Sequence, residues 1–183
     1  LWHLREELSR SGKVVYAKWY RGRATFFSKK LFTSALRVLS SGLEERILKR
    51  DLSRAAQTVL EILQSDSPLS GKMIRKLSEL TGKDNEKIYT QALKQLWDRL
   101  LIVGHGEIDD GAFPSLALGA TSVVFERLWS DSLKVSEVEA WSFLERKLGL
   151  HSAFFLYLQK QARLIRQKAV VEAAHGLSPE QLG

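Results

Sequence analysis

The amino-acid sequence predicts a mainly α-helical protein with small β elements. After residue 28, apolar residues recur every three or four positions through most of the chain, which is typical of helices with one buried face. Two stretches depart from this period. Residues 13–27, "KVVYAKWYRGRATFF", alternate on either side of a glycine, and "LLIV" at residues 100–103 precedes a loop rich in Gly and Asp. Both patterns are typical of β-strands.

The composition excludes several classes of protein. The 183 residues include no cysteine, which excludes disulfides and thiolate metal sites. Hydrophobic residues make up 44% and charged residues 27%, as in a globular protein of one large domain or two small ones. The longest apolar runs are far shorter than the roughly 20 residues of a membrane span. No signal-peptide pattern opens the sequence. We therefore expect a cytoplasmic protein with no membrane partner.

Residues 1–50 are expected to form a first domain, a basic β-hairpin followed by a helix. Val14 and Tyr16 alternate on one arm, an alternation that Trp19 would continue. Residues 24–27 form the other arm, and Arg21-Gly22 supplies the turn. Ser28 is a candidate N-cap for a helix that carries Leu31, Phe32, Ala35, Leu36 and Leu39. The stretch "SSGLEE" at residues 40–45 interrupts this pattern and is the candidate boundary.

Residues 51–130 are expected to form a second domain. Three helices are predicted: one capped by Ser53 with Ala56, Val59, Leu60 and Leu63; one with Met73, Ile74, Leu77 and Leu80; and one with Ile88, Ala92, Leu93, Leu96 and Leu100. Strand-like "LLIV", a loop at residues 104–111 and a second strand in "SLALGATSVVF" follow. This order of three helices, a strand, a wing and a strand is that of a winged helix-turn-helix domain.

Residues 131–183 are expected to form a C-terminal helical pair. Either Ser132 or Ser136 would cap a helix that carries Val135, Val138, Trp141, Leu144 and Leu148. The stretch "LGLHS" separates it from a longer helix with Phe155, Leu158, Ala162, Ile165 and Ala169 on one face. The final "GLSPEQLG" is interpreted as the start of another helix.

The net charge of +7 favours a polyanionic partner such as nucleic acid. Residues 1–50 hold 12 Lys and Arg against 4 Asp and Glu, whereas residues 51–130 hold 9 against 11. Residues 131–183 hold 7 against 6. The basic character is therefore almost entirely N-terminal.

Four stretches follow one another within roughly residues 1–129: "GKVVYAKWYRGRATFFSKKLF", "LSRAAQTVLEIL", "LSGKMIRKL" and "ALKQLWDRLLIVGHGE". In this order they resemble proteins related to the AlkZ-like DNA glycosylases. The glycosylases of that family are bacterial proteins built from winged-helix units. The resemblance therefore implies winged-helix architecture and a link to DNA repair.

The active glycosylases of the family carry a catalytic motif of Gln, an aliphatic or aromatic residue, and then Gln or Asp. This sequence offers only "QKQ", from Gln159 to Gln161, with a lysine in the middle. The two glutamines lie two positions apart on a predicted helix and so do not share a face. We therefore expect a non-catalytic or incomplete relative, with no catalytic residues assigned.

Metal and cofactor sites are also not expected. The histidines, His3, His105, His151 and His175, include no pair at metal-ligand spacing. His105 lies near Glu107, Asp109 and Asp110, but this stretch lacks the alternating ligands and closing glutamate of a calcium loop. We interpret it as an exposed polar wing.

Two surfaces are predicted to bind nucleic acid. On the second and third helices of the middle domain the predicted residues are Lys72, Arg75, Lys76, Lys87, Gln91 and Lys94; on the hairpin and its helix they are Lys18, Arg21, Arg23, Lys29 and Lys30. Gln and Lys side chains can contact base edges, and cations can contact phosphates. Asp84, Glu86 and Asp98 share the third helix and oppose this attraction, so the hairpin around Arg21-Gly22-Arg23 is expected to contribute most.

Aromatic residues lie between the hairpin cations: Tyr16, Trp19, Tyr20, Phe26 and Phe27. Such rings can stack on unpaired bases or wedge a base step. The same alternation is expected of a hairpin that buries an aromatic face.

The leading hypothesis is a non-enzymatic winged-helix protein that binds duplex DNA. One alternative is an interaction module whose C-terminal helices pack against a protein partner or a second copy, as the apolar "AFFLYL" suggests. A DNA glycosylase of the AlkZ-like family is the other alternative.

Overall fold

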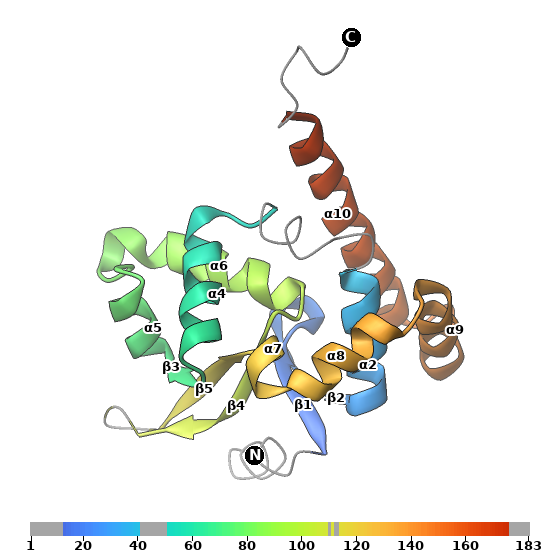
Figure 1. Cartoon of the computed structure of the whole chain (residues 1–183), viewed down its shortest axis with the longest axis horizontal. Coiled ribbons are helices and arrows are strands. Elements are labelled where there is room, and N and C mark those ends of the chain that lie inside the picture. The colour runs from blue at the N-terminus through green and yellow to red at the C-terminus, as the bar shows by residue number, and fades with distance from the viewer. Residues whose placement is uncertain (1–12, 41–50, 110, 112–113, 176–183) are drawn as a thin grey trace.

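The computed structural model describes residues 13–40, 51–109, 111 and 114–175. Within these ranges, helices predominate, and five strands form one antiparallel sheet in the order β2-β1-β4-β5-β3. Helices α4, α5 and α6 lie at one end of the molecule, and α2, α8, α9 and α10 lie at the other (Figure 1). The prediction of a mainly α protein with small β elements is confirmed.

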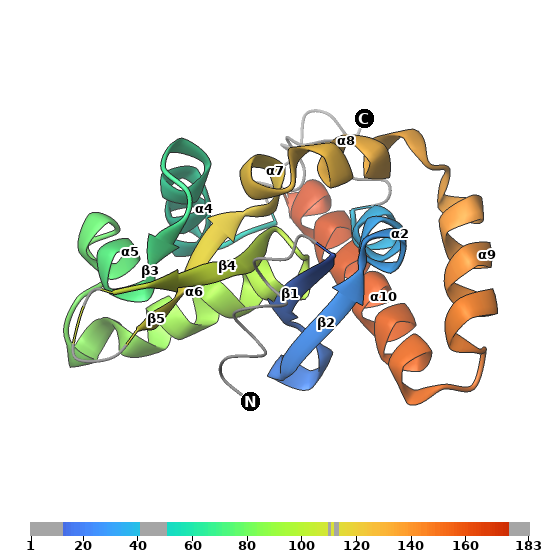
Figure 2. The same ribbon diagram turned by 90° about the horizontal axis from the view of Figure 1, so that it is seen from below.

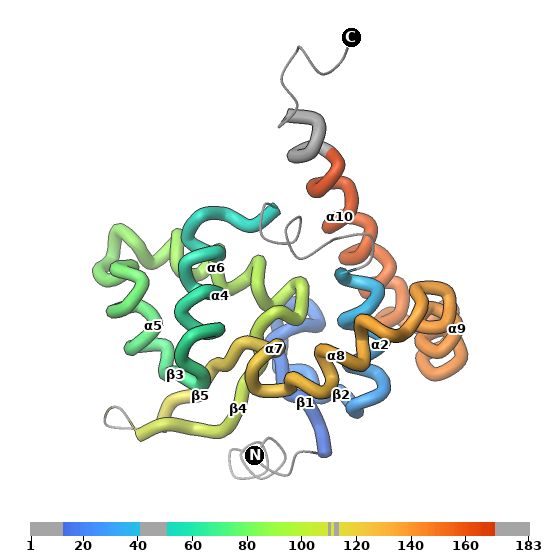
Figure 3. The backbone as a smooth tube through the Cα atoms, in the orientation of Figure 1, coloured from blue at the N-terminus to red at the C-terminus, as the bar shows by residue number. Residues whose placement is uncertain are grey.

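The elements follow one another in the chain path of Figure 3. The first part contains β1 (Val14–Lys18), the 3-10 turn η1 (Tyr20–Gly22), β2 (Ala24–Ser28) and α2 (Lys29–Leu39). The middle part contains α4 (Arg54–Ser65), β3 (Leu69–Ser70), α5 (Gly71–Leu77), the 3-10 turn η2 (Lys83–Asn85), α6 (Glu86–Asp98), β4 (Ile102–Ile108) and β5 (Ser115–Ala120). The last part contains α7 (Thr121–Val124), α8 (Glu126–Lys134), α9 (Glu137–Leu148) and α10 (Ala153–His175).

The predicted N-terminal hairpin is confirmed. Strands β1 and β2 pair from Val14 opposite Ser28 to Lys18 opposite Ala24. Arg21 and Gly22 both adopt the left-handed conformation in the turn, with φ of 53° and 71°. Glycine adopts this conformation without steric cost, which explains why the turn contains one.

The hairpin is part of the main sheet. Tyr16 of β1 lies opposite Gly104 of β4, so β1 joins the hairpin to the strands that follow α6. A Cβ atom at position 104 would collide with the Tyr16 ring and lie 3.0 Å from the Leu116 side chain. The glycine therefore allows the two strands to approach. The sheet therefore joins β1 and β2, which precede the predicted boundary at residues 40–45, to strands that follow it. Most of the boundary itself lies outside the described residues.

Serine side chains cap five of the described helices, including α10, where Ser152 Oγ accepts from Phe155 N at 3.1 Å. Ser28, Ser53 and Ser70 accept hydrogen bonds from the backbone N–H groups at the starts of α2, α4 and α5. Ser136 accepts from Glu139 N at 3.2 Å, and the Glu139 carboxylate accepts from Ser136 N at 3.0 Å. This capping box settles the choice between Ser132 and Ser136. The predicted caps at Ser28 and Ser53 are confirmed.

The strands after α6 differ from the prediction. Strand β4 continues to Ile108, so the predicted loop at residues 104–111 is wrong for its first five residues. A register shift between Gly104 and Glu107 lets Gly106 adopt a φ of 76° within the strand. Conversely, Thr121–Val124 form helix α7 and not the end of the second strand. Thr121 Oγ1 donates to Leu100 O at 2.5 Å, which turns the chain away from the sheet.

Some predicted core positions are exposed. Met73 and Leu77 of α5, Ile88 of α6 and Val138 of α9 are exposed to solvent. On α6, the side chains of Tyr89 and Trp97 are buried with Ala92 and Leu96, so the buried face is rotated away from Ile88. The short helix α5 buries only Ile74. In contrast, Phe155, Leu158, Ala162, Ile165 and Ala169 of α10 are all buried, as predicted.

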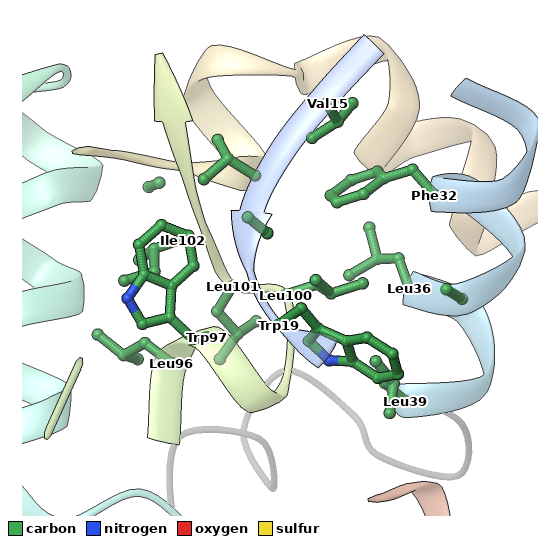
Figure 4. Close-up of a cluster of buried hydrophobic side chains, with 14 of the residues drawn as sticks. Val15, Trp19, Phe32, Leu36, Leu39, Leu96, Trp97, Leu100, Leu101 and Ile102 are labelled. Carbon is green, nitrogen blue, oxygen red and sulfur yellow. The ribbon is translucent and has the colours of Figure 1, made fainter. Parts of the chain in front are cut away.

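The core lies between the hairpin, α2 and the turn that joins α6 to β4 (Figure 4). Val15 and Trp19 of the hairpin and Phe32, Leu36 and Leu39 of α2 meet the segment from Leu96 to Ile102 there. Helix α2 also packs against α8, α9 and α10. The N-terminal hairpin and helix therefore connect the middle of the chain to the C-terminal helices.

None of the helices in the described part of the chain combines the length and the apolar character that crossing a membrane requires.

Candidate nucleic-acid interface

The turn of the hairpin is a closed loop that exposes three cations. We call residues 18–23 the hairpin tip. Trp19 N donates to Arg23 O, and Arg23 N donates to Tyr20 O, each at 3.0 Å. Thr25 Oγ1 accepts from Tyr20 N and donates to Arg23 O, both at 3.0 Å. Lys18, Arg21 and Arg23 are exposed around this braced backbone.

The hairpin tip rests on α6 and α10. Trp19 Nε1 donates to Asp98 O at 3.1 Å, and the Tyr157 hydroxyl donates to Trp19 O at 3.4 Å. The Trp19 and Tyr157 rings pack edge to face with centroids 5.1 Å apart, and the Tyr20 ring stacks on Phe154 at 5.3 Å. The tip is therefore anchored at the C-terminal end of α6 and the first turns of α10. Figure 2 shows the β1–β2 hairpin between these two helices.

The environment of Tyr157 places a cation from the hairpin tip and a cation from α6 near the same phenol. Burial raises the pKa of Tyr157, and the charge of Asp98 raises it further. The positive charges of Lys94 and Arg21 act in the opposite direction. Lys94 of α6 and Arg21 of the hairpin tip therefore both lie near the Tyr157 phenol.

Helix α6 presents three of the predicted residues on one side. Lys87, Gln91 and Lys94 are exposed and are spaced by four and three positions, so they lie above one another on the helix. We call these three residues the α6 face. Lys94 Nζ donates to the Asp98 carboxylate at 2.5 Å, which partly neutralises its charge. The α6 face continues into the hairpin tip through this Lys94–Asp98 pair.

Arg75 of α5 makes its contacts within the chain. Its guanidinium carbon lies 4.0 Å from the Tyr89 ring centroid, and its two terminal nitrogens donate to the Glu86 carboxylate, one of them at 3.0 Å. The hydrogen bonds raise the pKa of Arg75 and lower that of Glu86. Arg75 thus joins α5 to the start of α6, while Lys72 and Lys76 are exposed on the same helix.

The structure does not place the hairpin cations in one cluster. Lys29 and Lys30 follow Ser28, which pairs with Val14 at the end of the hairpin opposite the tip. Four residue steps at 3.3 Å separate the two ends by about 13 Å along the strand. Lys29 and Lys30 line a hollow of about 1000 Å³ with Val123, Phe125, Leu128 and Phe143 from the α7–α9 segment.

Most of the hairpin aromatic rings are internal. Tyr16, Trp19 and Phe27 are buried, and the Trp19 and Phe27 rings pack edge to face at 5.8 Å. Burial of an aromatic face therefore explains the alternation of these three. Phe26 is exposed and Tyr20 half-buried, so these two rings keep solvent-accessible area.

The remaining candidates are His105 and the two glutamines of the "QKQ" stretch. His105 lies half-buried in β4 with its ring edge-on to Phe125 at 5.9 Å, so its interpretation as part of an exposed wing is wrong. Strand β4 continues to Ile108, so His105 lies within the sheet and not in a loop. Among the described side chains, no group of three or more His, Asp or Glu could hold a metal ion. Gln159 is exposed and Gln161 half-buried on α10.

Two sets of contacts are not predicted from the sequence: those of Trp19 with α6 and α10, and the Arg99–Asp51 ion pair. The indole of Trp19 and the carbonyl of Asp98 are 79 positions apart, and Tyr157 is 138 positions from Trp19. The aromatic run "AFFLYL" could have indicated the contact between α10 and the hairpin. A helix with aromatic residues on two sides is expected to pack against two different elements. The Arg99–Asp51 ion pair, which is buried on both sides, carried no signal in the sequence.

Comparison with known proteins gives one match. A family model described as "AlkZ related" matches residues 1–152, from before the hairpin to just beyond the end of α9. The match extends past residue 129, where the resemblance noted in the sequence ended. No curated protein and no solved structure matches the chain. On the strength of the family match, which covers most of its length, the chain belongs to the AlkZ-related family.

Proposed function

We propose that the protein binds duplex DNA through the α6 face and the hairpin tip, as a non-enzymatic winged-helix protein linked to DNA repair. The order α4-β3-α5-α6-β4-β5 supports a winged helix, since β3 pairs with β5 and the short segment between α5 and α6 joins two helices as in a helix-turn-helix. In such a domain α6 is the helix that enters the major groove.

The observation that carries this proposal is the continuity of the α6 face with the hairpin tip. Helix α6 has 13 residues and is therefore about 20 Å long. Gln91 is suited to an adenine edge, and Lys87 to a guanine edge or a phosphate. Arg21 and Arg23 at the end of the helix are suited to the phosphate backbone that borders the groove. The tip supplies the positive charge that the middle segment of the chain lacks.

The link to DNA repair rests on the family. Nothing in the "QKQ" stretch supports catalysis, because the side chain of Gln159 lies on a different side of α10 from that of Gln161. A duplex that contains alkylated bases, incubated with the protein and then treated to cleave abasic sites, should remain uncut. Cleavage would assign the glycosylase function instead.

The binding proposal is tested by the affinity for a random-sequence duplex at several salt concentrations. The logarithm of the binding constant should fall linearly with the logarithm of the salt concentration, because phosphate contacts release counterions. Lys87→Glu should weaken binding and lower the slope by about 1. Lys147→Glu makes the same charge change on an exposed position of α9 and should leave the affinity unchanged. Equal effects of the two variants would contradict the proposal.

A further inference from the structure

We propose that the groove between α9 and α10 binds an acidic amphipathic helix of a partner protein. The groove has a volume of about 880 Å³. Its lining includes Trp141 of α9 and Leu156, Lys160, Arg163, Arg166 and Val170 of α10. Apolar and cationic side chains thus share one depression, at a site separate from the proposed DNA interface.

The apolar part of the groove is suited to a helix. The Trp141 ring is half-buried against Phe155, with centroids 5.9 Å apart. Leu156 is 51% exposed and Val170 is 69% exposed. These two residues are four turns apart on α10, or about 21 Å. An occupant that contacts both therefore has the length of several helical turns along the groove.

The charged part of the groove selects an acidic occupant. From residue 153 to residue 170, α10 contains four Lys and Arg and no Asp or Glu. Arg166 pairs with Glu137 of α9, which also accepts a hydrogen bond from Trp141 Nε1 at 3.2 Å. Within the described residues, neither Lys160 nor Arg163 makes an ion pair. Carboxylates of a partner would complement these two cations between the apolar ends.

A second copy of the chain does not have this complementarity. Arg163 lies seven residues from Leu156 and seven from Val170, at the midpoint of the groove. Two copies related by a two-fold axis would pair Leu156 with Val170 and place Arg163 opposite Arg163. Like charges at the centre of an interface oppose association. The occupant is therefore a different protein with acidic residues at this midpoint.

The groove and the hairpin tip lie on different sides of α10. Tyr157 contacts the tip, whereas Arg163 is six positions further along and about 120° away around the helix. The protein can therefore hold a partner helix and DNA at the same time.

The test uses two labelled helical peptides that differ only in charge. Each carries leucines spaced to meet Leu156, Trp141 and Val170, and one has glutamates between them where the other has lysines. Fluorescence anisotropy with the full chain should show the glutamate peptide binding about tenfold more tightly than the lysine peptide. Arg163→Glu should abolish most of this preference, because Lys160 and the new carboxylate offset one another. Lys168→Glu, an equal charge change on another side of α10, should leave it intact.

Three results would overturn the proposal. The first is no preference between the peptides in the wild-type protein. The second is an equal loss of peptide binding in Arg163→Glu and Lys168→Glu, with circular dichroism matching that of the wild type. The third is a concentration-dependent dimer that dissociates in Arg163→Glu, or a loss of duplex DNA binding in that variant, which would assign the groove to a second copy or to nucleic acid.

Discussion

Among single residues, Asp51 and Arg99 form the most deeply buried ion pair of the described chain. Both side chains are almost fully buried, and Arg99 Nη1 also donates to Gln95 O at 3.2 Å. The pair ties the segment before α4 to the end of α6. A buried charge that loses its partner keeps its desolvation cost, so the pair is more costly to break than an exposed one.

Asp51→Ala should lower the free energy of unfolding by about 3–5 kcal/mol, because it leaves the Arg99 guanidinium buried without a counter-ion. Urea unfolding followed by circular dichroism measures this loss. Glu86→Ala, which removes the partner of Arg75 in an exposed pair, is the control and should leave the urea midpoint nearly unchanged. Similar midpoints for the two variants would show that the Arg99–Asp51 pair contributes little.

The sequence predicted which charged residues are exposed better than it predicted their contacts. Lys87, Gln91 and Lys94 lie on one side of α6 as the helical period requires. The engagement of Arg75 by Glu86 and Tyr89 could not be predicted, because it depends on the angle between two helices. The spacing of apolar residues shows on which side of a helix a residue lies, but it does not show which residues of another element contact that side.

Among the elements, the junction between β1 and β4 depends on one glycine. Gly104→Ala would push a methyl group into the Tyr16 ring and separate the strands. The substitution should cost about 1–3 kcal/mol of unfolding free energy, the range for overpacking. Amide hydrogen exchange at residues 15–17 should accelerate more than exchange in α10. Adding Tyr16→Leu to Gly104→Ala should restore part of the lost unfolding free energy, because the smaller side chain makes room for the methyl group. If the losses of the two single variants simply add in the double variant, this account is contradicted.

Helix α9 should show a pH-dependent cap. Hydrogen bonds from Ser136 lower the pKa of Glu139 below its ordinary value of 4.5. A carboxyl with a lowered folded-state pKa contributes stability above its unfolded pKa and loses it as the pH falls through the folded value. Glu139→Gln should therefore lower the thermal midpoint at pH 7, and the deficit should shrink below pH 4.5. Glu145→Gln, on the same helix, should show no such deficit. A deficit that is constant with pH would contradict the assignment.

The type of an element was predicted correctly where the spacing of its apolar residues agreed with a capping or turn residue at its end. The hairpin, α4, α6 and α10 combine a clear pattern with a glycine turn or a serine cap. Helix α7 was missed because Thr121, Val123 and Val124 have high strand propensity. The hydrogen bond from Thr121 to Leu100, 21 positions away, overrides that propensity. Tertiary contacts of this kind are not visible in a local stretch of sequence.

At the scale of the whole molecule, the sheet and the core join the N-terminal hairpin to both later segments. Buried residues from Val15 to Ile165 belong to one cluster, and α2 contacts helices of the C-terminal part. No local pattern predicts the register between β1 and β4, so the sequence alone indicates a separate basic hairpin. In the folded chain the tip contacts α6 and α10, whereas Lys29 and Lys30 at the other end line the hollow beside α7–α9.

The most direct test of the proposed interface compares the two ends of the hairpin. Arg21→Asn with Arg23→Gln removes both tip cations, and asparagine tolerates the left-handed backbone at position 21. Lys29→Gln with Lys30→Gln removes the same charge at the far end. Affinity for a random-sequence duplex should fall in the tip variant, with a salt slope reduced by about 2, and stay near the wild-type value in the far-end variant. Equal losses in the two variants, or none in the tip variant, would contradict the assignment of DNA binding to the hairpin tip and the α6 face.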